Sequence, residues 1–277
     1  MPRSTSTTLS FPPFAGTVRK LVLANVAVFF AFLIINRASP AFGTRLLNLL
    51  WLRPASVATG FIWQLVTYCF VHIGMLSILF TMLTLWFCGS LLEGAYGSRW
   101  LTELYFTSAI GGAVLTAVLS FTGILHLSPD SAVTGAWGGL FGVLIAIAVR
   151  MGDVEFMMFP LPFTIRAKYM VAIDILIALA IVLGNQGAMG ALLQLSGALS
   201  GYLFLRFAPR RGLAFGFSEQ YFGLRNAYYK AKRRRAAKKF EVYMGKQGRQ
   251  VKFDDEGRYI DPDSPHGRDP NDKRWMN

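Results

Sequence analysis

Long runs of apolar residues recur along the first three quarters of the chain, and short polar segments separate them. A bilayer core about 30 Å thick needs roughly 20 mostly apolar helical residues to cross it. Six runs meet or approach this length. They cover residues 21–36, 75–93, about 101–121, 133–149, 169–184 and 187–207. The pattern therefore predicts an all-α membrane protein with six spanning helices.

The segment between the first two runs has a different pattern. Residues 42–68 mix Arg45, Arg53 and Pro54 with leucines and with Trp51 and Trp63. Aromatic and basic side chains are enriched where a bilayer meets water. We therefore expect an interfacial hairpin here and not a seventh span.

Composition and charge divide the chain into three parts. Hydrophobic residues make up 53% and charged residues 16% of the whole, which excludes a soluble enzyme, a disulfide scaffold and a disordered chain. Residues 1–205 carry 10 Lys or Arg and 6 Asp or Glu, whereas residues 206–277 carry 18 and 9. We predict a polar N-terminal segment (1–16), a membrane domain (17–208) and a basic tail (209–277).

The distribution of Lys and Arg near the span ends predicts the orientation. Eleven lie on the side of the N-terminus, and three (Arg37, Arg45 and Arg53) lie in the opposite loops. Basic residues accumulate on the cytoplasmic side of membrane proteins. The expectation is a multi-pass protein of the inner (plasma) membrane with both termini in the cytoplasm.

The tail contains the basic run from Lys230 to Lys239, in a sequence that favours a helix. Three interpretations are open. The preferred one is attachment to anionic lipid at the inner leaflet, because the run follows a cytoplasmic span end. The others are a solvated helix face without a partner, and binding of nucleic acid or a ribosome. Beyond Lys252 the composition is typical of a disordered segment.

Polar and small residues inside the spans are the first candidates for function, because burying polar groups in lipid is costly. Gly138 and Gly142 are four residues apart, as are Gly197 and Gly201, and such pairs let helix backbones approach closely. We expect the fourth and sixth helices to pack together near their outer ends. The other candidates are His72, Ser77 and Thr81 at the second span, Gly135 and Trp137 at the fourth, and Gln194 in the sixth.

The combination of these features resembles the rhomboid family of intramembrane serine proteases over residues 17–208. Residues 63–93 are similar to the family's second-helix region, and residues 159–176 to its approach into the fifth helix. The run Gly135-Ala136-Trp137-Gly138 lies where the family has Gly-x-Ser-Gly. Residues 194–201 match the sixth-helix pattern His-x-x-Gly-x-x-x-Gly, apart from its first position.

The resemblance implies a serine nucleophile and a histidine base, but this chain has Trp137 and Gln194 at those two positions. An indole has no nucleophilic lone pair, and a carboxamide does not accept a proton near neutral pH. The family's oxyanion positions are occupied by Ser77 and Thr81, which donate hydrogen bonds with a different geometry. Trp137 is also expected to fill the space where a scissile bond would lie.

Other ionisable residues suggest no replacement for the dyad. His72 and Ser77 are five residues apart, so they do not face each other on one helix, and a structural role is expected for His72. His126 and His266 are predicted in an outer loop and in the tail. We expect Asp174 to lie near the cytoplasmic end of its span, solvated or paired with Arg166 or Lys168. No metal cluster, phosphate loop or dinucleotide fingerprint occurs, so no cofactor is expected.

The leading hypothesis is a pseudoprotease that binds transmembrane helices of client proteins without cleaving them. The resemblance implies that such helices would approach between the second and fifth spans. Two alternatives remain open. One is an active intramembrane serine endopeptidase with non-standard residues. The other is a membrane tether that acts through its basic tail.

Overall fold

The computed structural model describes residues 12–123, 127–157, 164–184, 187–208, 213–248, 251–253 and 259–260. The chain forms two compact units, Met1–Gly212 and Leu213–Asn277. Most of the predicted N-terminal segment, as well as His126 and His266, lies outside the described residues.

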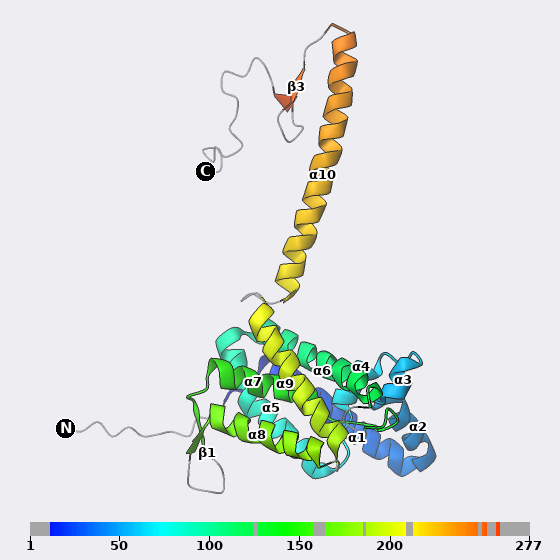
Figure 1. The fold of residues 1–277 in the computed structure, drawn as a ribbon, viewed down its shortest axis with the longest axis vertical. Coiled ribbons are helices and arrows are strands. Elements are labelled where there is room, and N and C mark those ends of the chain that lie inside the picture. The colour runs from blue at the N-terminus through cyan, green and yellow to red at the C-terminus, as the bar shows by residue number, and fades with distance from the viewer. Residues whose placement is uncertain are drawn as a thin grey trace, which may run out of the picture. The chain divides into compact units, whose positions relative to one another are not determined.

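The first unit is a bundle of helices at all six predicted positions (Figure 1). Its six apolar helices are α1 (Gly16–Ala38), α5 (Met75–Tyr96), α6 (Ser98–Phe121), α7 (Trp137–Arg150), α8 (Ala167–Leu183) and α9 (Ala188–Phe207). Among the described helices, four have the length and apolar composition for a full crossing: α1, α5, α6 and α9. With 14 and 17 residues, α7 and α8 are shorter than the roughly 20 that a full crossing needs.

The shortness of α7 corrects the expected start of the fourth span at Val133. Val133 instead pairs with Leu52 in an isolated antiparallel bridge, with N···O distances of 2.9 and 2.8 Å. Gly135 then adopts a φ of +101°, outside the helical region. The helix therefore begins only at Trp137, after the chain has turned.

The segment expected as an interfacial hairpin folds into short helices, none of which is long enough to cross a bilayer. These are α2 (Pro40–Leu50), α3 (Pro54–Ala58), α4 (Gln64–Thr67) and the 3₁₀ turn η1 (Tyr68–Phe70). Ser39 accepts a hydrogen bond from the Phe42 N–H, and Pro40 occupies the first turn of α2, which are common features of a helix start. The Trp63 indole N–H donates to the Leu49 carbonyl at 3.0 Å, so a side-chain hydrogen bond joins the end of α2 to the start of α4.

A short antiparallel ribbon connects α7 and α8. It consists of β1 (Glu155–Met157) and β2 (Thr164–Arg166), with Phe156 opposite Ile165. Next to it, the Asp153 carboxylate pairs with Lys168 Nζ at 2.7 Å and with Arg166 at 3.8 Å. These two contacts join the end of α7 to the start of α8.

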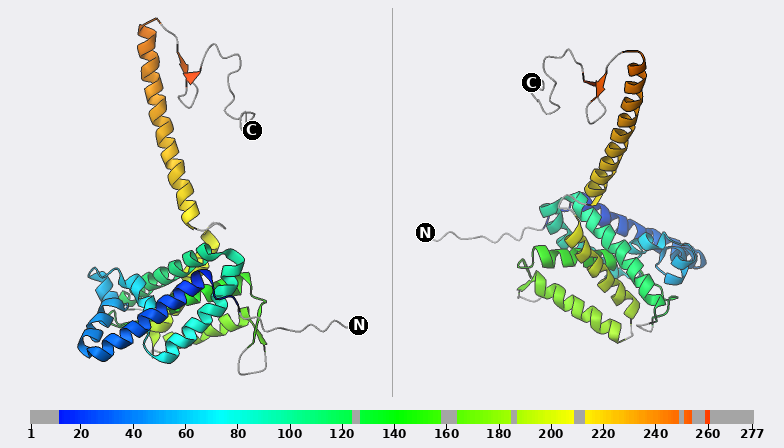
Figure 2. Two further views of the ribbon diagram at one scale, coloured as in Figure 1. Left: turned by 180° about the vertical axis from the view of Figure 1, so that it is seen from behind. Right: turned by 45° about the horizontal axis from the view of Figure 1, so that its top comes forward.

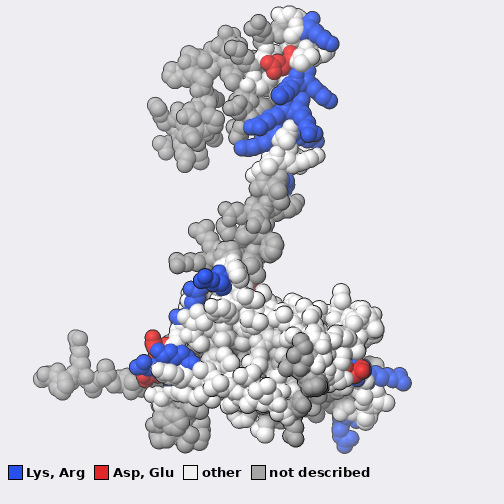
Figure 3. All heavy atoms as spheres, viewed as in Figure 1, with Lys and Arg blue, Asp and Glu red and all other residues white. Residues whose placement is uncertain are grey.

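The core of the bundle lies where α6, α7 and α9 meet. Most of α7 and α9 is buried, whereas α1 and α8 present many apolar side chains at the surface. In Figure 1 α8 runs beside α9, and Figure 2 shows α1 alongside α5 from behind. This surface is mostly uncharged in Figure 3, as expected for a protein solvated by lipid.

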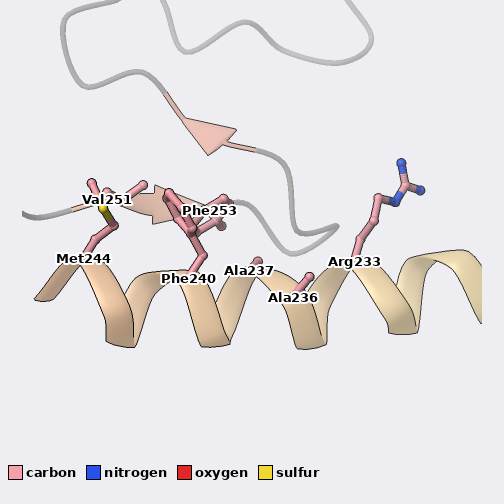
Figure 4. A pocket seen from close by; sticks show the side chains of 7 residues that line it. All are labelled: Arg233, Ala236, Ala237, Phe240, Met244, Val251 and Phe253. Atoms are coloured by element: carbon pink, nitrogen blue, oxygen red, sulfur yellow. The ribbon is translucent and has the colours of Figure 1, made fainter. Parts of the chain in front are cut away.

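The second unit contains the predicted basic helix, α10 (Leu213–Lys246), and two short paired strands, β3 (Lys252–Phe253) and β4 (Tyr259–Ile260). The strand pair corrects the expectation that everything beyond Lys252 lacks structure. Phe240 of α10 meets Phe253 of β3 edge-on at 6.2 Å between ring centroids. The two elements line an open apolar pocket of about 610 Å³, shown in Figure 4.

Candidate functional site

The glycines of α7 and α9 bring the two helix backbones into direct contact. A Cβ atom added at Gly201 would lie 2.6 Å from the Gly142 Cα, and one added at Gly197 would overlap the Gly138 backbone. Real Cβ contacts are not this short, so only glycine fits at these positions. The predicted packing of the fourth helix on the sixth is confirmed. The contact was expected near the outer ends of both helices. For α9 this expectation is wrong, because Gly197 and Gly201 lie in the middle of the helix.

A third helix takes part in the same contact, which the sequence analysis did not predict. A Cβ added at Gly112 of α6 would lie 2.9 Å from the Gly197 Cα. The Ser108 hydroxyl oxygen, one turn earlier on α6, would lie 3.0 Å from a Cβ at Gly201. The pair Gly111-Gly112 in the third span was the available signal. The site is therefore a three-helix contact of α6, α7 and α9.

Tyr68 holds the start of α7 against this contact. It is fully buried, and its hydroxyl donates to the Ala109 carbonyl on α6 at 2.9 Å. Its own carbonyl accepts from the Gly135 N–H at 3.0 Å. A Cβ at Gly138 would lie only 2.5 Å from the Tyr68 hydroxyl. Gly138 thus leaves room for the Tyr68 hydroxyl, and Tyr68 links α6 to the start of α7 by two hydrogen bonds.

Trp137 and Gln194 lie beside this packed centre. Trp137 is the first residue of α7 and is half-buried. Its ring meets Phe141 edge-on at 6.5 Å between centroids, and its Cδ1 would lie 3.1 Å from a Cβ added at Gly135. Gln194 is half-buried on α9 and follows Leu193, whose side chain would lie 3.5 Å from a Cβ at Gly138.

Ser77 and Thr81 interact with each other along α5. The Thr81 hydroxyl is fully buried and donates to the Ser77 carbonyl at 2.6 Å, while Ser77 is half-buried. A threonine hydroxyl that donates back to its own helix is satisfied without a ligand.

His72 lies before α5 and is 2% exposed. It lines a cavity of about 110 Å³ together with apolar residues of α1 and α2, among them Phe32 and Leu50. Neither ring nitrogen makes a hydrogen bond of ordinary geometry to another residue in the described part of the chain. His72 is the only histidine in the described part of the chain, so no imidazole–hydroxyl pair occurs there.

The position and the pairing of Asp174 differ from what the sequence predicted. The basic residues expected to pair with it, Arg166 and Lys168, are paired with Asp153 instead. The hydrogen bond from Lys168 holds the pKa of the Asp153 carboxyl below its usual range, and the nearby positive charges add to this. Asp174 lies seven residues into α8 and not at its end.

The described residues contain no group of three or more His, Cys, Asp or Glu that could hold a metal ion. Cys69 and Cys88 are both buried free thiols.

The fold and the glycine-packed centre define a multi-pass integral membrane protein of rhomboid-like architecture. Rhomboid-like protein 17, chloroplastic, of Arabidopsis thaliana is 32% identical over 143 residues, which are 47% of this chain and 41% of that protein. Rhomboid protease GluP of Bacillus subtilis (strain 168) is 31% identical over 93 residues, 34% of this chain and 17% of the relative. Matches to these curated relatives span less than half of their length.

A family model described as "Eukaryotic integral membrane protein (DUF1751)" matches residues 20–226. The chain belongs to this family, and with its curated relatives to the rhomboid family. The matched range includes the whole three-helix contact.

Proposed function

We propose that this protein is a pseudoprotease that binds transmembrane segments of client proteins without cleaving them. One observation carries the proposal: α6, α7 and α9 meet in a glycine contact, and Trp137 and Gln194, which lie beside it, stand where the resemblance puts the dyad. A serine needs an adjacent base to attack a carbonyl, and the one described histidine has no hydroxyl partner. We therefore expect the helix bundle to bind transmembrane segments although it lacks the groups that would cleave them.

The proposed orientation places both termini in the cytoplasm, with the inner (plasma) membrane as the location. It is supported by the excess of Lys and Arg at the α1 start, the α7–α8 connection and the α9 end. Cysteines introduced at Asp130 and Asp153, on opposite sides of the bundle in this topology, should react with an impermeant thiol reagent from opposite sides of the membrane.

The decisive experiment combines a cleavage assay and a binding assay. The purified full chain, incubated in lipid vesicles with generic rhomboid substrates, should yield no product but should capture their transmembrane segments. Cleavage that disappears when one serine is replaced would establish the rival function, an active endopeptidase with non-standard residues. Absence of both cleavage and capture would overturn the proposal.

A second candidate function is a membrane contact made by the tail. On α10 the residues spaced at 236, 237, 240 and 244 share one face, which Val251 and Phe253 partly cover. The basic side chains of Arg235, Lys238 and Lys239 are exposed, and Figure 3 shows the gathering of positive charge on the described part of α10. Anionic lipid is the preferred ligand, because the tail is already tethered to a bilayer.

This contact can be tested with the full chain reconstituted with and without phosphatidylserine. Tail proteolysis should slow when phosphatidylserine is present and recover in high salt. Replacing Arg235, Lys238 and Lys239 with Gln should remove the protection. Equal proteolysis in both lipids would contradict the contact, and protection by RNA alone would favour nucleic acid. The tether hypothesis requires that deleting residues 210–277 abolish function in the host.

A further inference from the structure

Asp174 is unusual among the ionisable residues of the bundle. In the described parts of the six apolar helices, every other Asp, Glu, Lys or Arg lies at most five residues from a helix end. Asp174 lies seven residues after Ala167 and nine before Leu183. At 1.5 Å per residue it is about 10 Å from the end of α8 that carries Lys168.

The carboxylate belongs to the face of α8 that is turned toward the other helices. Val171 and Ala178, three residues before and four after Asp174, are each 1% exposed. Residues at these spacings share one face of a helix. On the opposite face, Leu176 is 64% exposed. Asp174 itself is half-buried.

The same face of α8 packs on α9 close to Asp174. Ala178 and Val182 of α8 pack on Ala191 and Leu192 of α9. Asp174 therefore lies about one turn before the part of α8 that packs on α9.

No described group satisfies this carboxylate. Asp174 makes no ion pair or side-chain hydrogen bond within the described residues, and the two nearest basic residues on its side are held by Asp153. An unpaired acidic side chain inside the bilayer is energetically costly, and such side chains usually pair with a donor on a neighbouring helix. The described bundle leaves this position open to a donor from another molecule.

We propose that Asp174 selects client transmembrane helices that carry a Lys or Arg about 10 Å inside the membrane, measured from the Lys168 side. This inference rests on the proposed function, because it names the class of client that the pseudoprotease binds. The client's basic side chain pairs with the Asp174 carboxylate on α8, and the resemblance implies that the client helix approaches between α5 and α8. Helices with an apolar residue at this depth would leave the acid unpaired.

The test uses the full chain in phosphatidylcholine vesicles and synthetic single spans of Leu and Ala labelled with dansyl. One span carries Lys at the depth of Asp174, and its counterparts carry Leu or Glu there. Binding is measured by energy transfer from the protein's tryptophans. The unmodified protein should bind the Lys span about ten-fold more tightly than the Leu span, and the Glu span most weakly.

Asp174→Asn, which keeps the shape of the side chain, should reduce this preference to about three-fold or less. Asp174→Leu should abolish it and raise the thermal stability of the free protein, because an unpaired polar group is removed. Asp130→Asn makes the same chemical change on an exposed loop residue and should leave the preference unchanged.

The outcomes separate the two proposals. If the Lys and Leu spans bind alike, or if Asp174→Asn keeps the full preference, selection by Asp174 is wrong while client binding stands. If none of the spans binds the unmodified protein, the proposed function itself fails.

Discussion

The Glu93 carboxylate at the end of α5 accepts a hydrogen bond from the backbone N–H of Thr17, 76 residues earlier in the chain, at 2.5 Å. The Ser98 hydroxyl at the start of α6 donates to the same carboxylate oxygen, and the other oxygen accepts from the Val18 N–H at 3.1 Å. One side chain thus caps the first turn of α1 and joins three helices. A negative charge at a helix start is also favoured by the helix dipole.

Replacing Glu93 with Ala should lower the free energy of unfolding by about 1–3 kcal/mol, because two backbone N–H groups and a hydroxyl lose their acceptor. Unfolding in mixed detergent micelles measures this loss. Glu155→Ala removes an exposed carboxylate from β1 and serves as the control. A loss as small as that of the control would show that the cap contributes nothing.

Gly197→Ala should destabilise the bundle by about 1–3 kcal/mol or more, because the added methyl group overlaps the backbone of Gly138. Gly190→Ala is the matched control on the same helix, since a Cβ there meets nothing within 4 Å. The control should be neutral or stabilising by up to about 1 kcal/mol, because alanine favours helix. Equal effects of the two variants would contradict the close approach of α7 and α9.

Tyr68→Phe should lower the stability by about 1 kcal/mol, because it removes the hydrogen bond to the Ala109 carbonyl and keeps the ring. Tyr202→Phe removes a hydroxyl from a residue that is 49% exposed and should have no effect. The same unfolding assay compares the two. No difference between them would mean that the Tyr68 hydroxyl does not help to hold the start of α7.

The link between Asp153 and Lys168 should depend on pH. The pKa of Asp153 is held below its ordinary value in the folded protein, so the contribution is fully present above that ordinary value. It is lost as the pH falls through the lower, folded value. The difference in melting temperature between the unmodified protein and Asp153→Asn should therefore be constant from neutral pH to about 5 and vanish toward about pH 2. A difference that persists at the acid end would contradict this assignment.

Much of the architecture could be predicted from the order of the residues. The apolar runs placed all six helices, because lipid imposes a minimum apolar length on every crossing. The spacing of Gly138, Gly142, Gly197 and Gly201 predicted that α7 and α9 pack, since close backbone contact requires small residues at that interval.

Other features depend on segments that are distant in the chain. The apolar pattern predicted that the fourth span starts at Val133, but pairing with Leu52 removes Val133 from the helix. Asp174 was expected to be solvated or paired with Arg166 or Lys168, and both basic residues pair with Asp153 on the preceding loop. The local sequence pattern does not show whether Asp153 or Asp174 lies close to Lys168, because this depends on how the loop folds.

The sequence by itself determined that this is a rhomboid-like membrane protein, and its resemblance to the family predicts that Trp137 and Gln194 hold the nucleophile and base positions. Those conclusions depend on residue identity and local spacing, which need no tertiary information. Only the tertiary structure decided that Gly112 joins the glycine contact, that Glu93 caps α1, and that Arg166 and Lys168 pair with Asp153 and not with Asp174. Each of these is a meeting of helices far apart in the chain, and the packing of the whole bundle determines which side chains meet.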